Sequence, residues 1–243
     1  MKYRVFGTPR QVITKRFKAV PHTVLIPDTI CPALMDFLTP PFIIAMLTAL
    51  TVHEWSHGFV AYLLGDMTAK NEGRLTFNPL AHLDLLGTLM FFTIGFGWAK
   101  PVPVDPRYAK HPKRFMTLTA LAGPASNLLL AVGTVLVAKI VLAFGISAGI
   151  ANPFFSELFS SMLFLNLGLM AFNLLPIAPL DGSKILAMFI PYEYEVEYEH
   201  FLQKGPIILL LLLLGERMLG IPLIVTWISF ILSPILHFFE LLL

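Results

Sequence analysis

The segment Thr51-Val-His53-Glu54-Trp-Ser-His57-Gly58 lies within an apolar run, residues 37–65, and holds the only acidic, basic or histidine side chains of that run. On a helix, positions i and i+4 share a face, so His53 and His57 can present their imidazoles to one metal ion. Glu54 follows the first histidine and can reach a water bound to that metal. This spacing is typical of helices on which two histidines bind zinc and the glutamate is a general base.

The apolar setting of this motif separates a metal site from simpler explanations. Each ionisable side chain inside a membrane costs about 2.5–3.5 kcal/mol on insertion scales. Three such groups within five residues carry an insertion cost that a purely structural role does not readily explain. The simpler alternatives are a motif that occurs by chance and a polar packing cluster between helices.

The composition predicts an integral membrane protein. The chain has 243 residues, of which 56% are hydrophobic and 13% charged, and its mean hydropathy is +0.76. Soluble domains carry about 25% charged residues. The net charge of +2 gives no support for a nucleic-acid partner, and the single Cys31 excludes both an intrachain disulfide and a cysteine-rich zinc site.

Apolar runs and breakers predict an all-α polytopic membrane protein with three central spanning helices. The first helix is expected from Pro40 to Gly65, because proline suits a first turn and glycine a helix end. Its roughly 24 residues rise about 36 Å, enough for a hydrocarbon core of about 30 Å. The other two core helices are expected at 115–145 and 158–175. Three regions follow: a peripheral N-terminal arm (1–39), a membrane core (40–190), and a C-terminal loop with apolar helices (191–243).

The segments between the first two core helices are expected to approach the metal helix. A turn at 71–73 and a short strand at 74–77 are predicted. Residues 85–98 are apolar but too few to span, which favours a re-entrant or hairpin element. The prolines of 100–104 require an extended chain. The basic loop that follows is placed in the cytoplasm by the positive-inside rule, although the basic N-terminus would then lie outside, against that trend.

Two polar side chains in the later core helices are candidates for the site. Asn127 is an amide in an apolar helix, and its alternatives are an interhelical hydrogen bond or a direct role. Asp181 follows two helix-breaking prolines, Pro176 and Pro179, and Gly182 allows a tight turn after it. Since broken helices in membranes line cavities, Asp181 is a candidate third metal ligand. The alternative is an interfacial residue at a helix end.

The C-terminal region combines an acidic stretch with apolar segments. Residues 193–199 alternate glutamate with tyrosine or valine, and we expect a solvated interfacial loop that could contact the basic loop. Residues 205–214 and 219–243 are apolar and flank the pair Glu216-Arg217. They form either two short helices with this pair at the turn or one kinked unit.

Three motifs occur in order: His53-Glu-Trp-Ser-His57, Gly123-Pro-Ala-Ser-Asn127 and Asn173-Leu-Leu-Pro-Ile-Ala-Pro-Leu-Asp181-Gly182. Together they resemble the site-2 protease family of intramembrane zinc metalloproteases. Residues 73–80 and 97–104 also look like the small bacterial branch of that family, which lacks a PDZ domain. The resemblance covers roughly residues 40–190 and implies that this region is a catalytic membrane core with a three-helix catalytic core formed by the three central helices. It departs from the pattern at Ala178, where a proline is expected.

The resemblance implies one zinc ion per chain, with His53, His57 and Asp181 as ligands and Glu54 as catalytic base. It also implies that Asn127 and Asn173 could steady the substrate carbonyl or the oxyanion. His82 is expected to have a structural role.

The function implied is hydrolysis of peptide bonds within or near transmembrane segments. The expected partners are a membrane protein or peptide substrate and the lipid bilayer, and the expected location is the bacterial cytoplasmic membrane. One alternative is a catalytically silent homologue that binds a membrane partner. A metal-ion transporter is a second alternative, but the sequence has neither a second HExxH nor an internal repeat.

Overall fold

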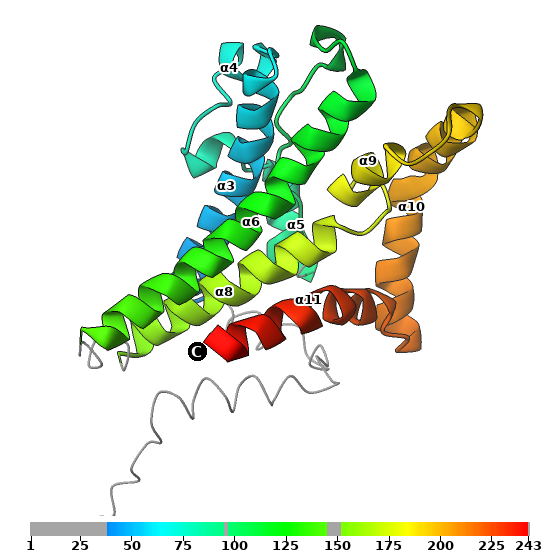
Figure 1. Cartoon of the computed structure of the whole chain (residues 1–243). Helices are drawn as coiled ribbons and strands as arrows, with labels where there is room; N and C mark the ends of the chain where they lie inside the picture. Colours follow the sequence, from blue (N-terminus) through cyan, green and yellow to red (C-terminus); the bar gives the residue numbers. More distant parts are fainter. Residues whose placement is uncertain (1–37, 95–96, 145–151, 243) are drawn as a thin grey trace, which may run out of the picture.

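The computed structural model describes residues 38–94, 97–144 and 152–242, and within these ranges the protein is helical with no β-strand (Figure 1). The arm predicted for residues 1–39 lies, apart from its last two residues, outside this part of the chain. The elements are α3 (Pro40–Leu63), α4 (Thr68–Asn71), η1 (Pro79–Ala81), α5 (Leu85–Ile94), η2 (Pro106–Tyr108), α6 (Pro112–Ala143), α8 (Pro153–Asn173), α9 (Asp181–Ala187), η3 (Tyr192–Tyr194), α10 (Glu195–Leu219) and α11 (Leu223–Leu242).

The three predicted core helices are confirmed as α3, α6 and α8, and each begins with proline. At α3 the Thr39 hydroxyl accepts a hydrogen bond from the Phe42 N–H at 3.3 Å. At α8 the Asn152 side chain accepts one from the Phe154 N–H at 2.9 Å. Proline lacks the N–H that a first turn cannot satisfy, and the capping side chain satisfies another. Local chemistry therefore sets where both helices begin.

Two of these helices, α6 and α8, are long and apolar enough to cross a membrane by length and composition. Helix α3 has 24 residues, but the polar side chains of its HExxH motif lower its hydropathy. Part of α11, Leu223–Phe239, forms a shorter apolar helix.

Helices α3, α6 and α8 pack against one another as an elongated bundle, and α11 runs back alongside α8 (Figure 1). Small buried residues at these contacts, among them Ala49, Ala131 and Ala171, allow the backbones to approach closely. The core between α6 and α8 is closed by Phe239 of α11. The indole N–H of Trp227, also on α11, donates to the Ala171 carbonyl at 3.0 Å.

The strand predicted at 74–77 is wrong. The Arg74 N–H donates to the Ala69 carbonyl at 2.8 Å and closes the end of α4, where Gly73 has φ +66°. A helix stop of this kind uses the backbone groups that a strand would need. The β-type pairing in the described residues nearby is one isolated antiparallel bridge between Leu83 and Ala99.

Within the predicted hairpin element, residues 85–94 form the ten-residue helix α5, and the described chain continues from Gly97 as a returning segment. The returning chain touches the helix backbone closely. A Cβ added at Gly87 would lie 2.2 Å from the Trp98 carbonyl oxygen, and one added at Gly97 would lie 2.2 Å from that of Gly87. A helix of this length rises only about 15 Å, too little to span a bilayer.

The segment 193–199 is largely exposed, as expected of a solvated stretch, but the predicted loop is wrong, because η3 and the first turn of α10 occupy it. Acidic side chains in a first turn are favourable to the helix dipole, and Glu195 and Glu197 lie there. The expected contact with the basic loop does form, as an ion pair between Lys113 and Glu195.

The C-terminal segments are two helices, as one of the two alternatives predicted. They are separated at Gly220, which has φ +66°. The Glu216 carboxylate accepts hydrogen bonds from the N–H groups of Ile224 and Val225, both at 3.3 Å. It therefore caps the helix that follows, and the charged pair lies next to the turn.

Candidate metal centre

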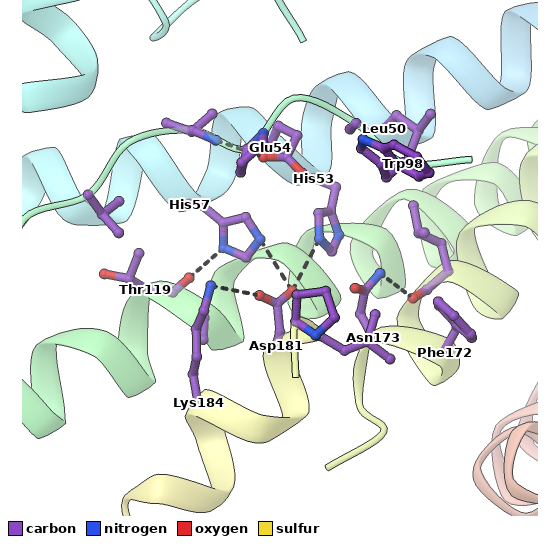
Figure 2. Close-up of a pocket in the computed structure, with 18 of the residues that line it drawn as sticks. Leu50, His53, Glu54, His57, Trp98, Thr119, Phe172, Asn173, Asp181 and Lys184 are labelled. Carbon is purple, nitrogen blue, oxygen red and sulfur yellow. Dashed lines mark hydrogen bonds and ion pairs between the residues drawn. The ribbon is translucent and has the colours of Figure 1, made fainter. Parts of the chain in front are cut away.

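The side chains of His53, His57 and Asp181 meet in the interior of the bundle (Figure 2). The two histidines lie one turn apart on α3, with ring centroids 4.7 Å apart. Asp181 is the first residue of α9, directly after the proline-containing break. Its Oδ2 atom lies 3.2 Å from His53 Nε2 and 3.3 Å from His57 Nε2. Residues 128 positions apart in sequence thus form one cluster, as the third-ligand hypothesis for Asp181 requires.

The hydrogen bonds of the two imidazoles leave their Nε2 atoms free to bind a cation. His53 Nδ1 lies 2.6 Å from the Asn127 side-chain oxygen, and His57 Nδ1 lies 2.7 Å from the Thr119 carbonyl oxygen. Both partners can only accept, so each Nδ1 carries a proton and, in the neutral ring, each Nε2 offers a lone pair.

Asp181 supplies the negative charge of this cluster. Its Oδ2 atom is buried and accepts no hydrogen bond within the described residues, despite its short distances to the imidazoles. Its other oxygen faces Lys184 Nζ at 3.9 Å. The candidate ligand atoms of the three residues lie within 4.8 Å of one another. Two neutral imidazoles and one unpartnered carboxylate oxygen fit a catalytic zinc ion, which takes three protein ligands and keeps one position open.

Glu54 lies beside this cluster, on the wall of a cavity of about 390 Å³ that the three residues also line. Its Oε2 atom accepts a hydrogen bond from the Val102 N–H at 3.1 Å (Figure 2). The carboxylate is therefore held in one orientation at the wall of the cavity that the three residues line. Asn173 and Lys184 also line the cavity, and apolar side chains, among them Trp98, Phe172 and Leu209, complete it.

The segment Lys100–Asp105, which we call the strap, runs along α3 and is fixed at several points. Its Val102 side chain packs directly on Gly58, where an added Cβ would lie 3.0 Å from Val102 Cγ1. The fully buried Asp66, just beyond α3, accepts the Asp105 N–H at 2.7 Å. At the other end the Arg74 guanidinium donates to the Lys100 carbonyl at 2.8 Å.

His82 also supports the strap, in keeping with the structural role expected of it. The His82 carbonyl accepts the Lys100 N–H at 2.8 Å. Its imidazole is buried, with Nε2 lying 2.8 Å from the Thr76 carbonyl. It does not line the cavity.

The two candidate asparagines have different environments. Asn173 lines the cavity and donates one hydrogen bond to the Leu169 carbonyl of its own helix at 3.0 Å. Asn127 is fully buried behind His53, and it donates to the Ala49 carbonyl at 3.2 Å and to the Asn166 side-chain oxygen at 2.8 Å. Since both amide hydrogens of Asn127 are taken by protein partners, the interhelical hydrogen bond accounts for this residue.

Two residues of the site were missed by sequence reasoning. Gly123 lies against both imidazoles, since a Cβ there would be 2.5 Å from His57 Nε2 and 2.6 Å from His53 Cε1. Asn166 is fully buried in α8 next to Asn127. Asn166 could have been found in the sequence as an isolated amide in an apolar helix, which is the feature that identified Asn127.

Comparison with known proteins gives the same assignment. The sequence profile described as Peptidase family M50 matches residues 138–213, a range that includes Asp181 but not the HExxH motif. “Putative zinc metalloprotease YwhC” of Bacillus subtilis is 43% identical over 155 residues, which are 63% of this chain and 71% of YwhC. “Putative zinc metalloprotease Rip2” of Mycolicibacterium smegmatis is 30% identical over 198 residues, which are 77% of this chain and 71% of Rip2.

Its counterpart of the same name in Mycobacterium tuberculosis is 31% identical over 184 residues, 72% of this chain and 66% of the relative. No solved structure gives a significant match. The sequence similarity over most of YwhC and the geometry of the cluster agree, and the chain belongs to peptidase family M50, the site-2 type zinc metalloproteases.

Proposed function

We propose that this protein hydrolyses peptide bonds within or near transmembrane segments of membrane proteins. One zinc ion per chain would be held by His53, His57 and Asp181, with Glu54 as general base. The observation that carries this proposal is the position of the Asp181 Oδ2 atom, unpartnered and within 3.3 Å of both imidazole Nε2 atoms.

The zinc ion, when bound, lowers the pKa of its water toward about 7 and polarises the scissile carbonyl. Glu54 takes the proton of the attacking water and later passes it to the leaving amine. The Val102 N–H supports this role, because a hydrogen bond to the carboxylate fixes its direction. Asn173 is the proposed donor to the developing oxyanion, since its amide lines the cavity and only one hydrogen bond from it is accounted for.

The substrate has to unwind before it reacts, because a transmembrane helix hides its carbonyls in hydrogen bonds. We propose that the unwound segment lies extended along the strap, next to Val102–Val104, and donates to the strap carbonyls, since the Val102 N–H is already bound to Glu54 and Pro103 has no N–H. Because residues 74–77 do not form a strand, the strap is the remaining predicted segment along which an extended substrate could lie. Its anchors at Asp66 and Arg74 support this role, because an edge that is already fixed loses less entropy on binding.

In the membrane, we propose a multi-pass protein of the bacterial cytoplasmic membrane with the strap and the basic loop on the cytoplasmic side. Helix α5 would then be re-entrant, entering and leaving on that side. Residues 40–190 would form the catalytic core, and residues 191–243 would pack against it. The bacterial relatives, the apolar helices α6 and α8, and the positive-inside rule support this arrangement.

The test is the Glu54→Gln variant, which removes the base and leaves the three ligands in place. We expect it to keep one zinc ion per chain and to lose cleavage of a membrane-embedded reporter. Glu72→Gln, at an exposed glutamate outside the cavity, is the matched control and should cleave normally. Wild-type cleavage by the Glu54 variant would exclude this mechanism. A wild-type protein that binds zinc but cleaves no membrane-embedded substrate would favour the silent homologue.

A further inference from the structure

A row of buried amides connects three helices behind the metal centre. Asn166 lies on α8, Asn127 on α6 and His53 on α3, and both asparagines are 0% exposed. The Asn166 Oδ1 atom accepts a hydrogen bond from Asn127 Nδ2 at 2.8 Å, and Asn127 Oδ1 lies 2.6 Å from His53 Nδ1. Each side chain therefore contacts the next, and the last contact is made to a candidate metal ligand.

The hydrogen bonds of this row can run in only one direction. Asn166 Nδ2 donates to the Met162 carbonyl at 2.7 Å, so its Oδ1 atom faces Asn127. Asn127 meets two acceptors on that side, Asn166 Oδ1 and the Ala49 carbonyl, so its amide nitrogen points there. Turning the Asn127 amide over would place an oxygen against two oxygens. Its own oxygen must therefore face His53, and that oxygen requires a proton on His53 Nδ1.

The two histidines differ in how they are held. His57 Nδ1 is paired with a backbone carbonyl, that of Thr119, which no substitution removes. His53 depends on a side chain, which depends in turn on a second side chain. Groups that bond the outer nitrogen of a metal-binding histidine fix its tautomer and ring orientation and increase its basicity.

We propose that Asn127 and Asn166 are positioning residues that fix the tautomer and orientation of His53 and so increase the affinity of the site for zinc. The proposal rests on the metal site of the proposed function, but not on any step of hydrolysis. Asn166 acts through Asn127, and Asn127 acts through His53. Neither residue lines the cavity, so neither contacts the substrate.

The cost of such groups in a membrane protein supports a functional role. Polar side chains in apolar helices are expensive unless they are paired, and pairing between helices contributes only modestly to stability. Replacing Asn166 with leucine, which is of similar size and apolar, is therefore expected to leave the fold in place. A purely structural pair would then show no change in metal binding.

The experiment measures the zinc dissociation constant of the full-length protein, purified in detergent, by competition with a chelator of known affinity. We compare the wild type with N127L, N166L and N127D. N127L removes the acceptor of the His53 Nδ1 proton and should weaken zinc binding about 10- to 100-fold. N166L leaves that acceptor in place but frees its amide to turn, so a smaller loss of roughly 3- to 10-fold is expected.

N127D is the conservative variant. As a protonated acid it keeps a carbonyl oxygen as acceptor for the His53 Nδ1 proton, and its O–H can donate to Asn166 Oδ1, so Asn166 keeps its hydrogen bond to the Met162 carbonyl. We expect zinc affinity within about threefold of the wild type, since a carboxyl group behind the histidine is a common arrangement in zinc sites. T134V on the same helix as Asn127 is the matched control, because the Thr134 hydroxyl bonds only the Leu130 carbonyl of its own helix at 2.8 Å and does not line the cavity. It should keep wild-type zinc affinity.

Wild-type zinc affinity in both N127L and N166L would overturn the proposal. A fall in zinc affinity in N127D as large as that in N127L would also overturn the proposal, because the asparagines would then act through packing rather than through the hydrogen-bond acceptor at His53. If N127L does not fold, as judged by size-exclusion chromatography, N166L and N127D decide. Because zinc binding is measured without a substrate, a failure of the proteolysis hypothesis leaves the result of this experiment unchanged.

Discussion

Substituting Gly123 with alanine is expected to disrupt the metal centre through a single methyl group. The added Cβ would lie 2.5 Å from both Cε1 and Nε2 of His57 and 2.6 Å from Cε1 of His53. Real Cβ atoms do not approach heavy atoms this closely, so the rings or helix α6 have to move. Neither ring moves freely, because each Nδ1 atom is held by a hydrogen bond to α6, at Asn127 or Thr119.

The size of the effect follows from the cost of overpacking. Extra methyl groups in well-packed cores cost about 1–3 kcal/mol. Because the collision is with the ligand atoms themselves, most of this cost is expected to appear in metal binding. At about 1.4 kcal/mol per factor of ten, zinc affinity should fall roughly 5- to 150-fold. Cleavage at limiting zinc should fall by a similar factor.

The measurement is zinc content and chelator competition on purified G123A, with reporter cleavage assayed in parallel. The control is G133A on the same helix, where an added Cβ meets nothing within 4 Å. G133A should bind zinc and cleave as the wild type does, and helix propensity favours alanine by about 1 kcal/mol. Unchanged zinc affinity in G123A would refute the placement of α6 against the two imidazoles.

Three further predictions concern the metal, the strap and the surface. Stripping the protein with a chelator should abolish cleavage, and one equivalent of zinc per chain should restore it; activity that survives complete removal of the metal would contradict the assignment. D66N should leave zinc content unchanged and reduce cleavage. The amide replaces one acceptor oxygen with a donor, so either the Asp105 N–H or the Thr68 N–H loses its acceptor. The local cost of this loss is about 1–3 kcal/mol. K113M breaks the partly exposed ion pair with Glu195 and the hydrogen bond from Lys113 Nζ to the Ile190 carbonyl, and it should lower stability by about 1–2 kcal/mol in thermal unfolding, with cleavage unaffected.

The local parts of the site could be predicted from the sequence because they depend on helix periodicity alone. His53, Glu54 and His57 lie within one turn, so the positions of the histidines on one face follow from 3.6 residues per turn. Asp181 could be proposed because the prolines before it break the helix and leave a side chain at the break. Its distance to the histidines could not be predicted, since that distance depends on how α3 and α9 are placed by α6 between them.

Contacts between helices were the part that the sequence left undetermined. Gly123 and Asn166 gain their roles from the relative register of α3, α6 and α8, and no local pattern encodes that register. The two wrong predictions have a different cause. At Arg74 a helix-terminating turn used the backbone groups that the strand needed, and at Glu195 a favourable helix start outweighed an alternating pattern.

The strap has a mechanical consequence for the way the site can open. Glu54 and Asp66 both belong to α3 or its immediate end, and both bind the strap through its backbone. The base and the strap therefore stay together when α3 shifts or rotates. Asp181 is not attached to this unit, because it begins α9, which packs mainly on α6 and follows α8 through the helix break at 174–180. A shift of α3 relative to α6 and α9 would therefore change the distance from the Asp181 carboxylate to the two imidazoles while the general base keeps its place on the strap.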